Sequence, residues 1–277
     1  MKILFTSSCK HLMPHASSMD LVVIRHFPDG EIDIHLPPDI QKNEDVWVIA
    51  SINTSQAFIE LLMVLDILSA KDVRIFLILT YVFYLRNGKT DQSSFGQTLL
   101  ELIQRCGVEK IIVLHPHAMN IESHKIEIRI WNDFFAECAR DFDVLVAPDR
   151  GARAVVEVIG KITNKPTLFL EKRRNDNGSL EIAPSASLNG ERVLILDDMI
   201  STGGTVIKAS EILKNAGASY VGAAATHGIF CNDALQRLKV SSIAKIFVTD
   251  TLHIPPEEQL IICSIVPFIN QLIKSTP

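Results

Sequence analysis

The sequence predicts an α/β protein with two similar domains, each a mostly parallel sheet flanked by helices. Short apolar runs alternate with stretches whose apolar residues recur at helical spacing, which is typical of parallel sheets covered by helices. A helix, a glycine, an apolar strand and a histidine follow one another in residues 102–117, and again 110 positions later in residues 212–227. With 277 residues, of which 47% are hydrophobic, the chain can form two cores.

Domain limits follow from where these segments fall. We expect a first domain over residues 1–140 and a second over residues 141–259. The tail, residues 260–277, has one more apolar run and a short helix at residues 267–274, and we expect it to pack back on the first domain.

Composition and charge exclude several classes of protein. The formal net charge of −5 leaves no basic face for nucleic acid, so no nucleic-acid partner is expected. The longest apolar run, residues 75–85, is shorter than the roughly 20 residues that span a bilayer, and residues 3–5 are too few for a signal-peptide core. A cytoplasmic protein without a membrane partner is expected. The cysteines have no Cys-x-x-Cys spacing and should be reduced: Cys9, Cys106, Cys138, Cys231 and Cys263.

The N-terminal part begins with two expected strands, at residues 1–5 and 21–24. Residues 28–30, Pro-Asp-Gly, are a turn signal, because proline fixes φ and glycine accepts a positive φ. Residues 31–36 alternate between apolar and polar, as an exposed strand does. Taken alone, this segment predicts a hairpin.

A strand at residues 46–51, a helix at 58–69 and a strand at 73–80 continue the alternation. Ligands of parallel sheets collect at the carboxyl ends of strands, and residues 81–91 follow such an end. Within them, Arg86 can bind a polyphosphate through its forked guanidinium. A solvated loop with two incidental basic residues is the alternative.

Two histidines, His115 and His117, are expected at the end of the strand that follows Gly107. Residues two apart on a strand share a face, so a zinc site is an option. It is a minor one, because the sequence offers no third ligand nearby.

Asp149 and Gly151 follow the expected strand at residues 144–147, and an apolar helical pattern begins at Val155. On local grounds, Asp149 and Gly151 simply stop the chain before that helix.

A later strand, at residues 167–170, leads into Glu171-Lys172-Arg173-Arg174 and the turn-rich residues 175–178. Three cations in succession usually mean a solvated loop.

The most informative segment runs from Arg192 to Thr205. An apolar run ends in Asp197 and Asp198, and small residues then lead into a helical pattern, which predicts strand, loop and helix. Glycine-rich backbone at a helix N-terminus suits a phosphate, while the two carboxylates suit sugar hydroxyls or a divalent cation. The alternative, an Asp-rich turn that caps the helix, needs one small polar residue rather than five. These five are Ser201, Thr202, Gly203, Gly204 and Thr205.

The segment from Leu196 to Thr205 resembles the phosphoribosyl-pyrophosphate signature of type I phosphoribosyltransferases and ribose-phosphate pyrophosphokinases. It has no Gly-Lys-Ser/Thr, which disfavours a Walker loop. Other segments resemble the pyrophosphokinase family in the same order along nearly the whole chain. They are Phe27-Pro28-Asp29-Gly30-Glu31, Tyr84-Leu85-Arg86, His117-Ala118, Pro148-Asp149-Arg150-Gly151, Lys172-Arg173-Arg174, Thr226-His227-Gly228 and Thr249-Asp250-Thr251.

This resemblance implies a type I phosphoribosyltransferase-like fold in both domains and transfer of the diphosphoryl group of ATP to ribose 5-phosphate, with Mg²⁺ as cofactor. It implies self-association into a dimer or hexamer, because the family's Phe-x-Asp-Gly-Glu segment reaches the adenine across a subunit interface. The implied catalytic residues are Lys172 and Arg174. The implied ATP-binding residues are Phe27, Asp29, Glu31, Arg86, Asn87 and His117. The implied ribose-5-phosphate-binding residues are Asp149, Asp197, Asp198, Ser201, Thr202, Gly203, Gly204 and Thr205. The implied metal ligands are His117 and Asp149.

Three positions depart from the family pattern. Asn87 and Gly88 replace Gln and Asp of the ATP loop, and His115 replaces an Asp whose carboxylate is the better Mg²⁺ partner. A phosphoribosyltransferase, which shares the central motif, is the first alternative. The departures favour the second, a non-catalytic regulatory relative. The first leaves Phe27–Glu31 without a role, and the second leaves Lys172 and Arg174 without one.

Overall fold

The computed structural model describes residues 1–15, 20–85, 95–117, 123–174 and 180–276, and for residues 172–174 and 180–182 only the backbone. The chain forms two compact units. Unit 1 comprises Met1–Ile130, Thr251–His253 and Ser264–Pro277, and unit 2 comprises Trp131–Asp250 and Ile254–Cys263. The chain therefore passes from one unit to the other at several separate points.

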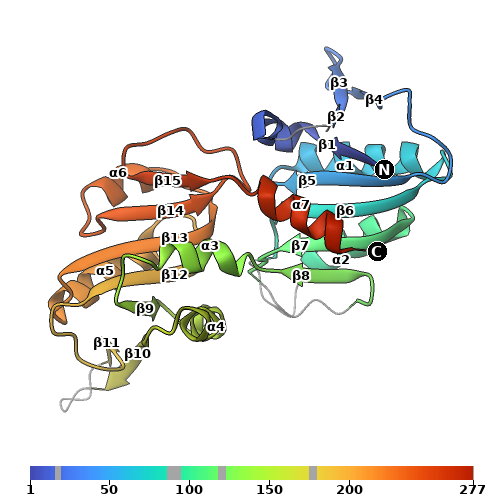
Figure 1. The fold of residues 1–277 in the computed structure, drawn as a ribbon. Coiled ribbons are helices and arrows are strands. Elements are labelled where there is room, and N and C mark those ends of the chain that lie inside the picture. Colours follow the sequence, from blue (N-terminus) through green and yellow to red (C-terminus); the bar gives the residue numbers. More distant parts are fainter. Residues whose placement is uncertain (16–19, 86–94, 118–122, 175–179, 277) are drawn as a thin grey trace. The chain divides into compact units, whose positions relative to one another are not determined.

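Unit 1 is built on a six-stranded sheet whose strands all pair in parallel, in the order β2-β1-β5-β6-β7-β8. The strands are β1 (Lys2–Phe5), β2 (Asp20–Leu21), β5 (Asp45–Ile52), β6 (Arg74–Val82), β7 (Val108–Leu114) and β8 (Ile126–Arg129). Helices α1 (Ser55–Ser69) and α2 (Phe95–Arg105) lie on one face, and α7 (Val266–Ser275) crosses the other (Figure 1). The central strands are buried on both faces, which explains their continuous apolar runs.

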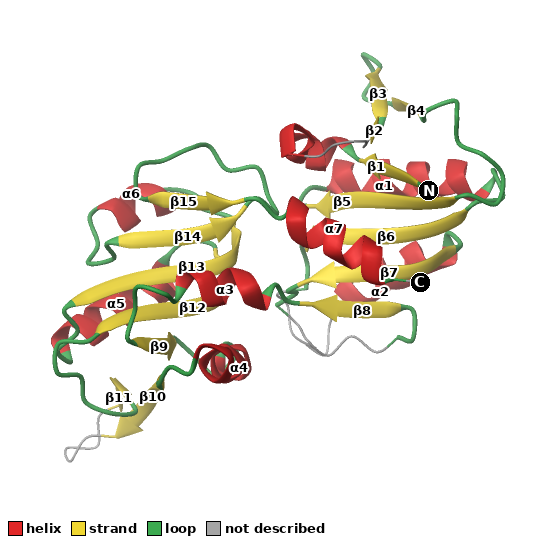
Figure 2. Ribbon diagram, viewed as in Figure 1, coloured by secondary structure: helices red, strands yellow, loops and turns green. Residues whose placement is uncertain are grey.

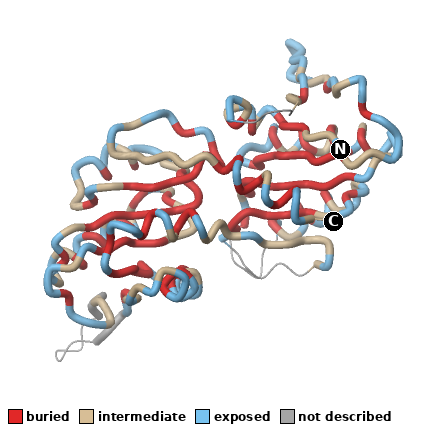
Figure 3. Tube along the Cα trace, viewed as in Figure 1, coloured by how far each residue is buried: buried red, intermediate tan, exposed pale blue. Residues whose placement is uncertain are grey.

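A two-stranded hairpin extends unit 1. Its strands, β3 (Val23–His26) and β4 (Ile32–His35), pair antiparallel, as the turn signal predicts. Gly30 takes a φ of 95° in the turn. The tip is exposed to solvent (Figure 3). The short 3₁₀ helix η1 (Ser7–His15), which follows β1, was not predicted.

Unit 2 has a seven-stranded sheet in the order β11-β10-β9-β12-β13-β14-β15. Only β11 runs antiparallel to its neighbour (Figure 2). The strands are β9 (Val144–Ala147), β10 (Thr167–Arg174), β11 (Leu180–Pro184), β12 (Arg192–Ile200), β13 (Tyr220–Gly228), β14 (Lys245–Thr249) and β15 (Leu260–Cys263). The helices are α3 (Asn132–Cys138), α4 (Arg153–Thr163), α5 (Gly204–Asn215) and α6 (Ala234–Lys239).

Each sheet has one point at which successive connections leave in opposite directions. In unit 1 the chain adds β2 on one side of β1 and later adds β5 on the other side. In unit 2 it adds β10 on one side of β9 and β12 on the other. The crevice at the carboxyl ends of the two strands that flank such a switch point is the usual ligand site of open α/β sheets.

The predicted fold class is confirmed. However, the repeat of residues 102–117 in residues 212–227, which suggested two related domains, matches elements that do not occupy equivalent positions in the two sheets. Gly107 and Gly217 do end their helices with positive φ, 79° and 106°. In sheet position, however, β7 corresponds to β14, whereas the strand after Gly217 is β13. The two sheets are alike because strands at equivalent positions follow in the same order.

Two further expectations changed. Residues 171–174 form the second half of β10, where a loop was predicted, because they pair with β11. Strand β8 and helix α3 were not predicted; both are short. In the described part of the chain, no helix is long and apolar enough to cross a membrane.

Candidate functional site at the switch point of unit 2

The switch point of unit 2 lies between β9 and β12. Asp149 follows β9, and its Oδ1 accepts hydrogen bonds from the N–H groups of Gly151 (2.8 Å) and Ala152 (3.2 Å). These bonds fix the turn before α4 and hold the carboxylate at the carboxyl end of the sheet. The local interpretation, a stop before the helix, and the ligand-binding interpretation are therefore compatible.

Asp197 and Asp198 lie within the last residues of β12, beside β13. The Asp198 N–H donates to Asp197 Oδ1 at 2.9 Å. Burial raises the pKa of Asp197 well above its ordinary value, and the negative charges of Asp198 and Asp149 raise this pKa further. The charges of two neighbouring carboxylates thus act on Asp197. Such a cluster favours a proton, a divalent cation or hydroxyl donors in contact with it.

Beyond β12, residues 201–203 form the loop that leads into α5. Gly203 is the N-cap of α5 with a φ of 77°, and no side chain caps the helix. The first helical bond runs from the Ile207 N–H to the Gly203 carbonyl, at 2.9 Å. The N–H groups of the first turn therefore have no acceptor within the helix. With the positive end of the helix dipole, they form an anion-binding terminus.

The two glycines of this loop have different roles. A Cβ at Gly203 would lie 3.3 Å from Leu238 Cγ and 3.5 Å from Ile207 Cδ1, so this position packs inward. Its positive φ is what requires glycine. A Cβ at Gly204 would meet only Thr202 Oγ1, at 3.7 Å. Gly204 therefore leaves space beside the helix N-terminus.

The Thr226-His227-Gly228 segment ends β13. Thr226 and His227 are buried. The backbone of His227 forms an isolated antiparallel β-bridge with that of Asp250. Thr249 donates its hydroxyl to the Thr226 carbonyl at 2.7 Å. These residues join the ends of β13 and β14 and support the sheet next to the loop.

The implied ATP-side residues that the structure describes belong to unit 1. Phe27, Asp29 and Glu31 form the exposed tip of the β3–β4 hairpin. The Phe27 N–H donates to the Glu31 carbonyl at 2.9 Å, and the Glu31 N–H to Asp29 Oδ1 at 3.2 Å. The Arg25 guanidinium lies 5.1 Å from the centre of the Phe27 ring. The tip is thus an ordered turn that presents an aromatic ring and carboxylates to solvent.

The histidine pair is arranged differently from its prediction. β7 ends at Leu114, so His115 and His117 do not share a strand face. His115 is buried with a φ of 39°, and its N–H donates to the Arg129 carbonyl at 2.9 Å, whereas His117 is exposed. Among the described residues, no group of three His, Cys, Asp or Glu side chains could hold a metal ion.

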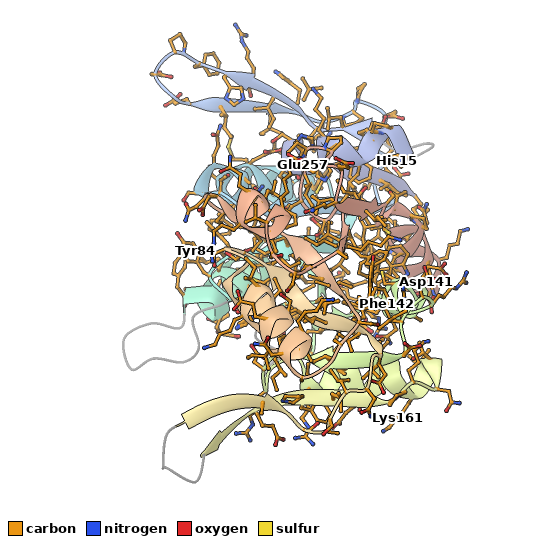
Figure 4. All side chains as sticks on the ribbon, turned by 90° about the vertical axis from the view of Figure 1, so that its left-hand side faces the viewer. His15, Tyr84, Asp141, Phe142, Lys161 and Glu257 are labelled. Carbon is orange, nitrogen blue, oxygen red and sulfur yellow. The ribbon has the colours of Figure 1, made fainter. Side chains whose placement is uncertain are left out.

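The described residues do not include all of the predicted site. Arg86 and Asn87 lie outside them; the adjacent Tyr84 (Figure 4) contacts the Phe95 ring edge-on, with centroids 5.0 Å apart. For Lys172 and Arg174 only the backbone is described. Lys172 pairs with Ile182 and Arg174 with Leu180, so both belong to an antiparallel ribbon.

Elsewhere in unit 2, a hollow of about 410 Å³ lies where α4 ends and β10 begins. Glu157, Lys161 (Figure 4) and Thr167 contribute to its lining. Because β10 starts there, the hollow is at the amino edge of the sheet. It is therefore separate from the switch-point site.

Sequence reasoning missed two residues that contact the loop. The Cys231 N–H donates to the Ser201 carbonyl at 3.0 Å, and Arg237 Nη1 to the Thr202 carbonyl at 3.3 Å. Each lies at least 30 residues downstream of its partner, so only the folded chain brings them together.

Comparisons with known proteins agree with this geometry. The profile of the phosphoribosyl transferase domain matches residues 117–255, and that of the N-terminal domain of ribose phosphate pyrophosphokinase matches residues 5–107. A ribose-phosphate pyrophosphokinase of Sulfurisphaera tokodaii is 32% identical over 263 residues, which cover 88% of this chain and 90% of the relative. One from Thermoplasma acidophilum is 31% identical, with 82% of each chain covered. The crystal structure of phosphoribosylpyrophosphate synthetase from Mycobacterium smegmatis matches with a TM-score of 0.84 and 25% identity, covering 99% of this chain and 98% of the other.

Proposed function

The chain belongs to the ribose-phosphate pyrophosphokinase family, and on that premise we propose that it transfers the diphosphoryl group of ATP to the 1-hydroxyl of ribose 5-phosphate. The products are phosphoribosyl pyrophosphate and AMP. The observation that carries the proposal is the switch point of unit 2, where the Asp197–Asp198 pair leads into the uncapped N-terminus of α5 opposite Asp149.

Ribose 5-phosphate fits this site in one direction. Its phosphate is held by the N–H groups of residues 201–205 at the start of α5, where backbone donors and the helix dipole favour an anion. The sugar hydroxyls donate to the carboxylates of Asp197 and Asp198, and Asp149 completes the sugar end. The reverse orientation would place a phosphate against three carboxylates, which repel it.

Mg²⁺ fits the donor set of this site. Asp149 and Asp197 offer hard oxygen ligands, and a cation would relieve the repulsion that raises the pKa of Asp197. The described residues contain no ready-made cage of three ligands. In many phosphate-binding proteins Mg²⁺ takes one or two protein carboxylates and substrate phosphates as its ligands. A Mg²⁺ ion held by the carboxylates of Asp149 and Asp197 would supply positive charge next to the phosphates of the substrates. His117 of unit 1 is the other metal ligand that the family resemblance implies.

We assign the ATP side to residues 1–140 with the tail 260–277, and the ribose-phosphate side to residues 141–259. Phe27, Asp29, Glu31, Arg86 and Asn87 bind the nucleotide. The hairpin tip that carries the first three is solvent-exposed, as a segment that completes a neighbour's site would be, so we propose a dimer or hexamer. We also propose a cytoplasmic location.

Lys172 and Arg174 are the proposed catalytic residues. Their backbone lies at the end of the β10–β11 ribbon. Cations delivered to the transferring phosphoryl group stabilise its transition state most strongly where water is excluded. These two residues would supply charge there, while the rest of the site positions the reactants.

A coupled assay of AMP release tests the proposed reaction. The protein is incubated with ATP, Mg²⁺ and ribose 5-phosphate, and AMP is measured with and without the sugar. Release that depends on ribose 5-phosphate supports the proposal. Nucleotide formation from phosphoribosyl pyrophosphate and a free base would instead identify a phosphoribosyltransferase. Binding of both substrates without turnover would identify a regulatory relative, the alternative that Asn87, Gly88 and His115 favour.

A further inference from the structure

The phosphate-loop candidate, residues 201–203, is held by a segment that follows β13. Ile200 at the end of β12 accepts two bonds at its carbonyl, from the N–H groups of Ile229 (2.9 Å) and Phe230 (3.1 Å). The Ser201 carbonyl accepts from the Cys231 N–H at 3.0 Å. Three successive N–H groups of the downstream segment therefore donate to two successive carbonyls, one at the end of β12 and one in the loop.

Helix α6 continues this support at the next residue. Arg237 Nη1 donates to the Thr202 carbonyl at 3.3 Å. Its neighbour Leu238 is 1% exposed and lies against Gly203, where an added Cβ would come within 3.3 Å of Leu238 Cγ. The Gly203 carbonyl accepts the first bond of α5. Each carbonyl from Ile200 to Gly203 thus has a donor among the described residues. The donor to Thr202 is the side chain of Arg237, and the donors named above for the other three are backbone N–H groups.

The supporting segment, residues 229–232, adopts an unfavourable backbone conformation when its N–H groups donate to these carbonyls. Phe230 and Asn232 have positive φ, 47° and 56°. A bulky residue with positive φ is rare, and such strain persists only where the surroundings impose it. The Phe230 ring lies so close to Gly228 that a Cβ there would be 2.5 Å from Phe230 Cε2. Packing against Gly228 therefore fixes the turn that presents the three amides.

A phosphate-binding loop requires this arrangement of its peptide groups. A carbonyl oxygen that faces a phosphate repels it, whereas an N–H group attracts it. Because each peptide plane carries its N–H and C=O on opposite sides, a donor that holds a carbonyl outward also turns the following N–H inward. The Thr202 carbonyl and the Gly203 N–H belong to one such plane.

We propose that Arg237 is a positioning residue for sugar-phosphate binding, which acts by holding the Thr202 carbonyl so that the Gly203 N–H faces the phosphate. This rests on the proposed function, in which residues 201–205 bind that phosphate. Arg237 acts as a hydrogen-bond donor to the loop and does not itself contact the ligand. The N–H groups of Arg237 therefore matter more for ribose 5-phosphate affinity than its positive charge does.

Three substitutions separate these roles. Arg237→Ala removes both the donor and the charge, Arg237→Gln keeps an N–H donor without the charge, and Arg237→Lys keeps both in a different shape. Lys239→Ala is the matched control. Lys239 is the other cation in the last turn of α6, and its Nζ pairs with Glu257 at 2.6 Å instead of the loop.

Calorimetry first measures ribose 5-phosphate binding to the unaltered protein, and steady-state kinetics then give KM for each substrate. For Arg237→Ala we expect the Kd and KM for ribose 5-phosphate to rise about three- to tenfold, the scale of one hydrogen bond. We expect the KM for ATP and the Tm to stay the same. Arg237→Gln and Arg237→Lys should recover at least half of the lost affinity, and Lys239→Ala should match the unaltered protein.

Each other result overturns a distinct statement. If the unaltered protein does not bind ribose 5-phosphate, the proposed function fails and the inference fails with it. If it binds and Arg237→Ala binds equally well, only the inference is wrong. If Arg237→Lys recovers affinity and Arg237→Gln does not, Arg237 acts through charge. A rise in KM for both substrates together with a lower Tm would show a general structural role instead.

Discussion

The switch point of unit 1 is closed by the chain's own polar groups, whereas that of unit 2 ends in carboxylates and an uncapped helix. In unit 1, Glu60 is 2% exposed, and its carboxylate accepts from the Ser7 N–H at 2.7 Å and from the Ser7 hydroxyl at 2.5 Å. The Ser51 N–H donates to Ser8 Oγ at 3.0 Å. An internal carboxylate thus occupies the place next to β1 and β5 where a ligand could lie.

The helices that follow β5 and β12 differ in the same way. The N-cap of α1 is Thr54, whose side chain accepts from the Ala57 N–H at 3.0 Å. The N-cap of α5 is Gly203, which has no side chain to offer. Two sheets of the same strand order therefore present different groups at their switch points, because the residues that follow the strands differ.

Breaking the loop of unit 2 should have the largest effect. In Gly203→Val, a β-branched residue must adopt positive φ and its Cβ meets Leu238 at 3.3 Å, so the first turn of α5 shifts. We expect ribose 5-phosphate affinity in calorimetry to fall by about 10²-fold or more, the scale of losing several backbone donors. Gly190→Val is the control, since Gly190 also has positive φ, 97°, but no atom within 4 Å of its Cβ position. Unchanged affinity in Gly203→Val would reject the loop as the phosphate site.

Replacing one carboxylate of the cluster should lower activity and raise stability. In Asp197→Asn we expect kcat/KM for ribose 5-phosphate to fall by about 10²-fold, because a sugar contact is lost. Since the folded state raises the pKa of Asp197, its ionisation destabilises the fold as the pH rises from the ordinary value of 3.8 through the folded pKa.

The variant should therefore be more stable than the unaltered protein at neutral pH, and equally stable below the ordinary aspartate pKa. Urea unfolding at several pH values measures this. Asp143→Asn is the control, because Asp143 lies at the amino edge of the same sheet and accepts from the Arg192 N–H at 2.8 Å. A loss of stability at neutral pH in Asp197→Asn would contradict the statement that ionised Asp197 destabilises the fold.

Removing the Glu60 carboxylate from the switch point of unit 1 should lower stability and leave the switch-point site of unit 2 intact. Glu60→Ala removes the acceptor for both Ser7 donors, so we expect a loss of about 2–4 kcal/mol in the free energy of unfolding. Glu60→Gln keeps one acceptor and should lose about half as much. Ribose 5-phosphate affinity at a temperature where the variants are folded should not change. A specific loss of that affinity would show that Glu60 serves the ligand, against the comparison.

The smallest effect should come from the cap of α1. Thr54→Ala removes the hydroxyl that accepts from Ala57, which costs about 1 kcal/mol of stability. Thr54→Ser should restore most of it. Denaturant unfolding measures the difference, and turnover should stay within experimental error in both variants. Equal losses in Thr54→Ser and Thr54→Ala would show that the threonine methyl group, which both variants lack, matters more than the cap.

Sequence reasoning worked where the signal was local. The hairpin at Gly30 and the strand, loop and helix around Gly203 each follow from a few adjacent residues whose φ preferences and hydrogen bonds are fixed locally. The grouping of Asp149 with Asp197 came from the family resemblance alone, and in the structure the negative charge of Asp149 does act on Asp197.

Sequence reasoning failed where the structure of a segment depends on residues outside that segment. Residues 171–174 are a strand because they pair with β11, and no property of Lys172 or Arg173 alone favours that state over a loop. The donor from Arg237 to Thr202 is likewise a product of the packed fold. The offset between residues 102–117 and 212–227 was misleading for a related reason, since helix, glycine and strand recur throughout α/β sheets.

The division of the chain between the units has a consequence for how the protein forms. Unit 2 has all its residues once Cys263 has been made. Unit 1 starts at Met1 but also includes Ser264–Pro277, with helix α7 and its buried Ile269. During synthesis from the N-terminus, the half that is made first is therefore the last to be completed. Until α7 leaves the ribosome, the face of the first sheet that α7 covers remains exposed to solvent.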